Sequence, residues 1–145
     1  MTTQPGTLYG IGVGPGDPDL LTLKAVNLLQ QVDIVFTAAS TKNDYSLAVN
    51  IARAHIPART AIRALAFPMT KDRAETRRAW EANAQTIAEA TAGGRQAAFL
   101  TLGDPLTFST FGYILKYMRR LFPVHPVVTV PGITSYQASA AALNT

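Results

Sequence analysis

Short apolar runs alternate along this chain with longer segments in which apolar residues recur at helical spacing. The short runs predict five strands, over residues 7–13, 32–36, 60–67, 96–102 and 126–130. The periodic segments predict helices over residues 23–31, 46–55, 72–91, 111–122 and 134–143. Because strands and helices alternate, we expect an α/β fold with a mostly parallel five-stranded sheet and helices on both faces.

Residues that favour helix ends mark where several of these helices begin or stop. Thr22 is suited to cap the first helix, Pro57 lies just beyond the second, and Gly93 and Gly94 end the third. The apolar face of the third helix comprises Trp80, Ala84, Ile87, Ala88 and Thr91, and that of the fourth comprises Phe111, Ile114, Leu115, Met118 and Phe122. We also expect Tyr113 in the core and His55 at an exposed helix end.

Composition narrows the chemistry that the chain can perform. Its 145 residues suit one ordinary domain, and 48% apolar against 15% charged residues is typical of a globular protein. The absence of cysteine excludes disulfides, thiolate metal sites and cysteine nucleophiles. The two histidines, His55 and His125, are far apart, so we expect no histidine-based zinc site and no metal.

Charge and hydropathy give expectations about partners and location. The net charge of +4 is mild and suits an acidic small molecule or simply a solvated surface. The basic residues are scattered, so we expect no nucleic-acid partner. Residues 1–6 lack a signal-peptide pattern, and no apolar run approaches the roughly 20 residues that a membrane span needs. We therefore expect a cytoplasmic protein with no membrane partner.

Three glycine-bearing segments follow predicted strands. The first holds Gly10, Gly12, Gly14 and Gly16 with Pro15 between the last two; the second is 103–105 (Gly-Asp-Pro); the third is 131–135 (Pro-Gly-Ile-Thr-Ser). Glycine lets a backbone turn tightly and approach a ligand closely. Since ligands of open α/β sheets bind beyond the carboxyl ends of the strands, these segments predict one site.

Common nucleotide fingerprints do not fit the first segment. The dinucleotide pattern Gly-x-Gly-x-x-Gly would need glycine at position 15 or 17, where Pro15 and Asp17 stand, and no phosphate-binding P-loop is present. A looser Gly-x-Gly-x-Gly matches Rossmann-like methyltransferases. Those enzymes place an acid after the second strand, whereas residues 36–40 contain none and Asp33 lies at the start of that strand.

Taken together, the three segments, with Leu-Leu-Thr-Leu-Lys-Ala at 20–25, resemble the tetrapyrrole (corrin/porphyrin) methyltransferase family over residues 8–142. The resemblance implies an S-adenosylmethionine-dependent enzyme that acts on a tetrapyrrole and forms a homodimer. Members have two α/β domains with the cofactor in the cleft between them. We therefore expect residues 1–145 to be the N-terminal domain of such a methylase, with the C-terminal domain absent from this chain.

Further segments resemble one subgroup, the enzymes that methylate carbon 20 of precorrin-2 in cobalamin biosynthesis. These are 67–69 (Phe-Pro-Met), Trp80, 99–105 and 108–113. Sirohaem-pathway members usually carry a glycine where Leu102 stands and a Gly-Arg pair near Ser109 and Thr110. Two alternatives remain: another corrin- or sirohaem-pathway methylase, and an inactive domain that serves binding or dimerisation.

The resemblance also implies roles for particular residues. Cofactor-binding residues would be Pro15, Leu102, Gly103, Asp104, Thr107, Thr134 and Ser135, and substrate-binding residues would be Gly14, Gly16, Asp17, Ser109 and Thr110. Asp104 is a candidate for the proton-abstracting base, and no other catalytic residue is assigned. Asp17, Ser109, Thr110, Thr134 and Ser135 are also of the types that cap turns and helices, so a purely structural role is the alternative for each.

Overall fold

A computed structural model describes residues 4–39 and 46–145. Residues 1–3 of the N-terminal segment and Ser40 of the acid-free segment therefore lie outside the described residues. The strands are β1 (Leu8–Gly12), β2 (Ile34–Ala39), β3 (Ala61–Ala66), β4 (Ala97–Thr101) and β5 (Val127–Val130). The helices are α1 (Leu23–Leu29), α2 (Leu47–Ala52), α3 (Arg73–Thr91), α4 (Phe111–Leu121) and α5 (Ser135–Leu143), with 3-10 turns η1 (Pro18–Leu20) and η2 (Arg53–His55).

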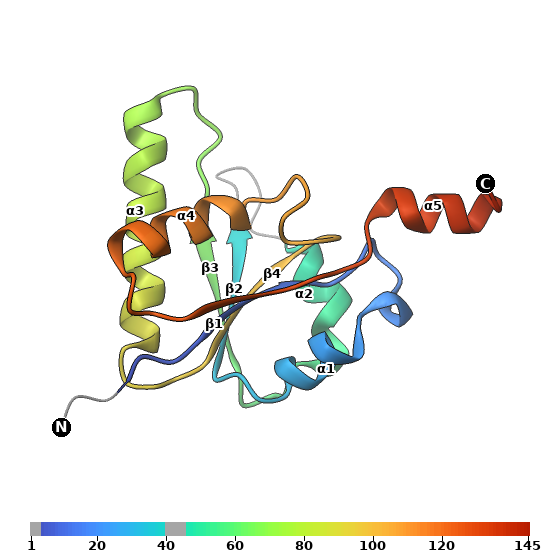
Figure 1. The fold of residues 1–145 in the computed structure, drawn as a ribbon, viewed down its shortest axis with the longest axis horizontal. Coiled ribbons are helices and arrows are strands. Elements are labelled where there is room, and N and C mark those ends of the chain that lie inside the picture. The colour runs from blue at the N-terminus through green and yellow to red at the C-terminus, as the bar shows by residue number, and fades with distance from the viewer. Residues whose placement is uncertain (1–3, 40–45) are drawn as a thin grey trace.

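The five strands form one sheet in the order β3-β2-β4-β1-β5, and every pairing between them is parallel (Figure 1). The predicted sheet is thus confirmed. Because the strands are parallel, all their carboxyl ends lie along one edge. The end of β4 lies between those of β1 and β2, so segments that follow these strands become neighbours.

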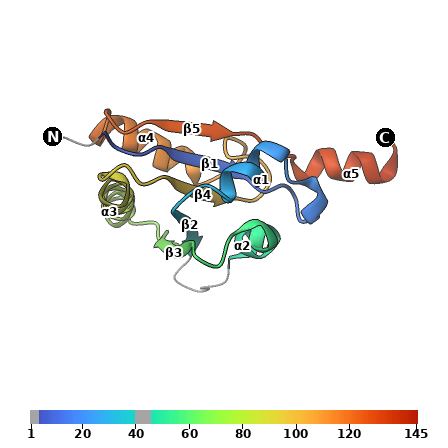
Figure 2. The ribbon, with the colours of Figure 1, turned by 90° about the horizontal axis from the view of Figure 1, so that it is seen from below.

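Helices cover both faces of the sheet, as expected (Figure 2). Side chains alternate along each strand, so Phe99 of β4 points to one face and Leu100 to the other. The face toward α3 and α4 buries a cluster that includes Phe36, Phe99, Phe111, Ile87 and Met118. The face toward α1 and α2 buries a cluster that includes Ile11, Leu29, Val35, Val49 and Leu100. None of the helices in the described ranges combines the length and hydropathy that a bilayer span needs.

Gly10 has a packing role in this core. It lies inside β1, and a Cβ atom added to it would come 2.3 Å from Cζ of Phe111. The missing side chain therefore lets the Phe111 ring of α4 lie directly on the strand. The sequence grouped Gly10 with the loop glycines that follow it, but the structure gives it this separate role.

Three sequence expectations need correction. The second strand runs over Ile34–Ala39 and not 32–36, because the amide of Val32 still closes α1 (3.1 Å to the Leu28 carbonyl) and the small residues after Phe36 pair with β3. The second helix tightens into η2, where the Ile56 amide donates to the Arg53 carbonyl ahead of Pro57.

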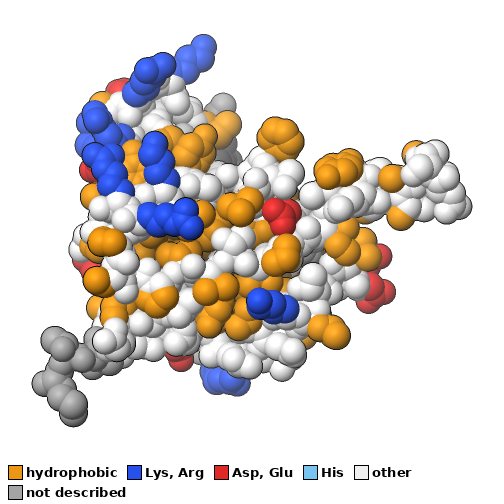
Figure 3. Space-filling view, viewed as in Figure 1, with side chains coloured by type: hydrophobic (Ala, Val, Ile, Leu, Met, Phe, Trp, Pro, Cys, Tyr) orange, Lys and Arg blue, Asp and Glu red, His pale blue; other side chains and the backbone are white. Residues whose placement is uncertain are grey.

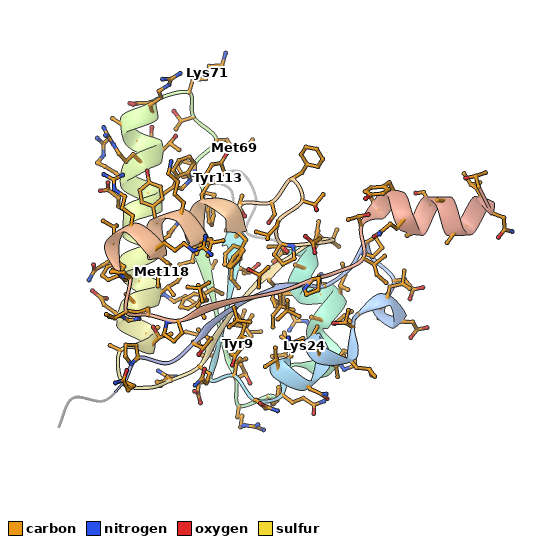
Figure 4. All side chains as sticks on the ribbon, in the orientation of Figure 1. Tyr9, Lys24, Met69, Lys71, Tyr113 and Met118 are labelled. Atoms are coloured by element: carbon orange, nitrogen blue, oxygen red, sulfur yellow. The ribbon has the colours of Figure 1, made fainter. Side chains whose placement is uncertain are left out.

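Tyr113 is the third correction. It is 45% exposed, and it stacks on Trp80 of α3 with ring centroids 4.0 Å apart, whereas Met118, further along α4, is buried (Figure 4). Tyr117 takes the buried position in its place. The helical spacing of Tyr113 sets it at the border of the α3–α4 contact and not beneath it.

Asp33 and α5 lie where the sequence predicts them, at the start of the second strand and at the C-terminal end of the chain. The structure adds a hydrogen bond for Asp33 and shows how α5 is placed. Asp33 Oδ2 accepts a hydrogen bond from the Gln96 amide (2.8 Å) at the amino end of the strands, far from the carboxyl edge. Helix α5 contains no buried residue and extends away from the sheet beyond β5 (Figures 1 and 2).

His125 gives a pH prediction for the fold. Its Nδ1 lies 3.0 Å from the Thr91 hydroxyl, its ring meets the Phe122 ring edge-on, and burial lowers its pKa below the ordinary value of 6.5. The unfolded chain therefore takes up a proton more readily than the folded protein, and the free energy of unfolding should fall as the pH drops from 7 through 6.5 toward the folded pKa. Urea unfolding at pH 7.5 and 5.5 measures this change.

Two variants isolate the His125 contribution. His125→Asn should flatten the fall in unfolding free energy between the two pH values. Val124→Ala, which changes an exposed neighbour of His125 that carries no titratable group, should leave the fall as in the wild type. Equal slopes in all three proteins would contradict the assignment.

Candidate functional site

Three loops meet at the carboxyl edge of the sheet. They are residues 13–17 after β1, 102–110 after β4 and 131–134 after β5, and we call them the loop triad. β1 pairs with β4 on one side and with β5 on the other, so the triad forms around the end of β1. The predicted convergence of the three glycine-bearing segments on one edge is therefore observed.

The first two loops are joined through Gly14 and Gly103. The Gly103 amide donates to the Gly14 carbonyl (2.8 Å), and the Gly14 amide donates to the Gly103 carbonyl (3.3 Å), which makes an isolated antiparallel bridge. Gly14 has φ +81° and Gly103 has φ +61°, a region that residues with side chains rarely adopt. Glycine at both positions is thus a requirement of the bridge.

The backbones of Gly12, Gly103 and Gly132 lie in direct contact. A Cβ on Gly12 would come 2.3 Å from the Gly103 carbonyl oxygen, and a Cβ on Gly132 would come 2.1 Å from the same oxygen. Both distances are far shorter than any real contact, and the atom approached belongs to the backbone. The three segments can therefore close on one another only because these positions lack side chains.

The Asp104 carboxylate joins the second loop to the third. Its Oδ1 accepts from the Gly132 amide (2.9 Å), and its Oδ2 accepts from the Leu106 amide (3.0 Å) and the Thr107 hydroxyl (3.3 Å). Both oxygens are thus engaged with the protein itself. This geometry favours a positioning role for Asp104 and argues against its use as a base. The role of Asp104 as a base stays an untested prediction.

The third loop leads into the N-terminus of α5. Thr134 forms a capping box with Gln137, whose Oε1 accepts from the Thr134 amide (3.0 Å). The amides of Ser135 and Tyr136, in the first helical turn, donate to no protein group within the described residues. These two amides are therefore available to an anionic group such as a carboxylate.

The remaining first-loop residues are mostly exposed. Asp17 accepts from the Asp19 amide (2.9 Å) and caps η1, which is the structural alternative that the sequence allowed. Gly16 is exposed with φ +146°, and Pro15 is half-buried between it and the Gly14–Gly103 bridge. Contact of Gly14, Gly16 and Asp17 with a substrate stays a prediction.

A cavity of about 340 Å³ lies on the other side of the second loop, between the ends of β2 and β4 and the start of α2. We call it the β2–β4 cavity. Ser109 and Thr110 line it, as does Leu102, but Gly14, Gly16 and Asp17 do not. Ser109 also accepts a hydrogen bond from the Phe111 amide (3.1 Å), just ahead of α4, whose N-cap residue Thr110 makes no capping hydrogen bond with its side chain. The structure therefore separates the expected substrate residues into two groups.

Four other residues line this cavity to which the sequence analysis assigned no role in the site. They are Thr37, Ser46, Thr101 and Phe108. The hydroxyls of Thr37 and Ser46 form a short hydrogen bond with each other, and Ser46 caps α2 by accepting from the Val49 amide (3.2 Å). Thr101 and Phe108 lie in the segments 99–105 and 108–113 that resemble the family subgroup, and this was the signal available in the sequence.

Comparisons with known proteins match nearly the whole chain. The family model described as Tetrapyrrole (Corrin/Porphyrin) Methylases matches residues 7–145. The chain is 38% identical over 136 residues to the cobalt-precorrin-2 C(20)-methyltransferase of Salmonella typhimurium, covering 94% of this chain and 56% of that protein. It is 39% identical over 137 residues to the probable cobalt-precorrin-2 C(20)-methyltransferase of Methanocaldococcus jannaschii, covering 94% and 57%.

The fold matches a solved structure as well. It resembles the uroporphyrin-III C-methyl transferase from Thermus thermophilus complexed with S-adenyl homocysteine, with a TM-score of 0.65 and 28% identity over 93% of this chain and 48% of that one. The chain thus spans little more than half the length of the curated relatives that it matches.

Proposed function

This chain belongs to the tetrapyrrole (corrin/porphyrin) methylase family, and on that premise we propose that its loop triad forms one side of an S-adenosylmethionine site. The observation that carries the proposal is the joining of three distant loops by the Gly14–Gly103 bridge and the Asp104–Gly132 hydrogen bond. We further propose that the 145 residues correspond to the N-terminal domain of the two-domain enzymes that the family comprises.

The residues of the triad fit the methionine part of this cofactor. The amides of Ser135 and Tyr136 suit its carboxylate, because a helix N-terminus favours negative charge. The close glycine contacts would let a ligand lie directly against the backbone. Gly103 would contact the ligand in this way, together with Leu102 next to it and Thr107 in the same loop. Pro15 stiffens the first loop, since its ring fixes φ. The carboxylate of Asp104 adds negative charge near a ligand that carries ammonium and sulfonium groups.

The proposed reaction is methyl transfer to carbon 20 of precorrin-2, or of its cobalt form, in cobalamin biosynthesis. Two relatives with 38–39% identity carry names of that activity, which supports this substrate over the sirohaem-pathway alternative. S-adenosylmethionine supplies a methyl carbon that is already activated on a positively charged sulfur. The part of this chain is then to hold donor and acceptor in line, and positioning alone can lower a barrier by roughly 7–11 kcal/mol in ideal cases.

A titration with S-adenosylhomocysteine tests the cofactor site, and an assay with precorrin-2 tests the reaction. We expect saturable binding of S-adenosylhomocysteine in calorimetry, and a product that carries one added methyl group at carbon 20. A product methylated elsewhere would favour another enzyme of the same family. An absence of any binding would favour the alternative of an inactive binding or dimerisation domain. The homodimer and the cytoplasmic location stay predictions.

A further inference from the structure

We propose that the β2–β4 cavity receives one edge of the flat, uncharged part of a tetrapyrrole, with Phe108 stacking on the ring and the Thr101 hydroxyl forming a hydrogen bond to that edge. The inference rests on the proposed function and deepens it, because it assigns two positioning residues for the acceptor. Each residue has a feature that destabilises the fold: a strained backbone at Phe108 and an unpaired buried hydroxyl at Thr101. No contact among the described residues compensates for either.

Phe108 is an exposed aromatic residue in an unfavourable backbone conformation. Its side chain is fully exposed, and its φ is +49°, in the left-handed region that disfavours residues with a Cβ. Phe108 is among the residues that line the β2–β4 cavity. Strained residues of this kind persist mainly where function requires them. A ring held at the mouth of a cavity is suited to stack on a flat conjugated ligand.

Thr101 carries a buried hydroxyl that has no partner in the described part of the chain. It is 6% exposed, and its Oγ1 forms no hydrogen bond within the described residues. It lines the cavity from the end of β4, whereas the neighbouring hydroxyls of Thr37 and Ser46 satisfy each other. A buried polar atom without a partner costs free energy, and a ligand with a donor or acceptor at its edge would supply that partner.

The uncharged character of the described lining favours entry of the uncharged part of the ligand. The described residues of the cavity lining, among them Ala38, Leu47 and Leu102, carry hydroxyl or apolar side chains, and none of these residues is charged. About 340 Å³ accommodates part of a macrocycle and not the whole. Lysine and arginine side chains gather instead over α3 and α4, where Figure 3 shows them as a separate group. The carboxylate arms of a tetrapyrrole would therefore point out of the cavity toward solvent.

Two pairs of variants test this in the full chain. Phe108→Gly removes the ring and the strain, and Val124→Ala removes an exposed apolar side chain that lies outside the three loops and does not line the cavity. Thr101→Val removes the unpaired hydroxyl at nearly constant shape. Thr60→Val does the same at a second buried hydroxyl that has no partner among the described residues; Thr60 precedes β3 at the opposite edge of the sheet.

Three quantities are measured for each variant. They are the affinity for uroporphyrin III, detected through the fluorescence of that ligand, the affinity for S-adenosylhomocysteine, and the thermal unfolding midpoint. Phe108→Gly should weaken uroporphyrin III binding about tenfold or more without lowering the midpoint, since glycine adopts this φ freely. Thr101→Val should weaken it about threefold to tenfold, again without lowering the midpoint. Val124→Ala and Thr60→Val should bind both ligands as the wild type does.

Three results would overturn the proposal: unchanged uroporphyrin III affinity in both Phe108→Gly and Thr101→Val, the same loss in the control variants, or no binding of uroporphyrin III by the wild type. Binding of S-adenosylhomocysteine stands apart from all three. If the wild type binds that ligand but no tetrapyrrole, the cofactor site stands and the cavity assignment fails. If tetrapyrrole binding depends on Phe108 but S-adenosylhomocysteine does not bind, the cavity assignment stands and the proposed function fails.

Discussion

Gly132→Ala is expected to abolish measurable binding of S-adenosylhomocysteine, with a dissociation constant raised at least a hundredfold. The new methyl group would stand 2.1 Å from the Gly103 carbonyl oxygen, so the second and third loops must separate. Backbone atoms cannot turn aside as a flexible side chain can. Overpacking of this kind costs about 1–3 kcal/mol, and we expect an equal loss in the free energy of unfolding.

Gly93→Ala is the matched control. A Cβ at Gly93 would meet nothing within 4 Å, so binding and stability should stay within twofold and about 0.5 kcal/mol of the wild type. Calorimetry with S-adenosylhomocysteine and urea unfolding measure both effects. If Gly132→Ala bound the ligand as tightly as Gly93→Ala, the close contact of the loops would not be needed for the site.

Asp104→Ala is expected to produce the second large effect. It removes the acceptor of three donors at once: the amides of Gly132 and Leu106 and the hydroxyl of Thr107. Leaving donors without partners costs about 1–3 kcal/mol each when they are buried, and these groups are partly exposed, so we expect a total loss of about 2–4 kcal/mol in unfolding free energy. S-adenosylhomocysteine binding should weaken at least tenfold as the third loop is released.

Asp104→Asn separates positioning from base catalysis. One amide oxygen can still accept from the Gly132 amide, but the NH₂ group would face the Leu106 amide, donor against donor. We therefore expect stability and cofactor affinity between those of the alanine variant and the wild type. A variant with unchanged stability and cofactor affinity but no methyl transfer would contradict this account and identify Asp104 as the base.

The sequence predicted the architecture well because its signals are local. Alternating apolar runs and helical stripes predicted the five strands and the five α-helices of the described residues, and the predicted cap Thr22 begins α1 in the structure. Errors arose where tertiary contacts decide. Ala38 and Ala39 have little strand preference, yet they extend β2 because Leu65 and Ala66 of β3 pair with them.

The candidate site was predictable only in part. The three glycine-bearing segments could be placed at one edge, since parallel strands end together. The Asp104–Gly132 hydrogen bond joins residues 28 positions apart, and no local pattern predicts such a partner. The β2–β4 cavity was missed for a related reason. The φ of Phe108 and the unpaired hydroxyl of Thr101 are properties of the folded chain and have no counterpart in residue type.

The central claim is that the loop triad holds the methyl donor against its backbone. An NMR titration of the ¹⁵N-labelled protein with S-adenosylhomocysteine tests it directly, because each amide reports its own environment. We predict the largest shift changes at the amides of Gly14, Gly103 and Ser135, with no change at His55 or His125 at the opposite end of the sheet. Shift changes that spare all three loops, or that gather at the amino ends of the strands, would contradict the claim.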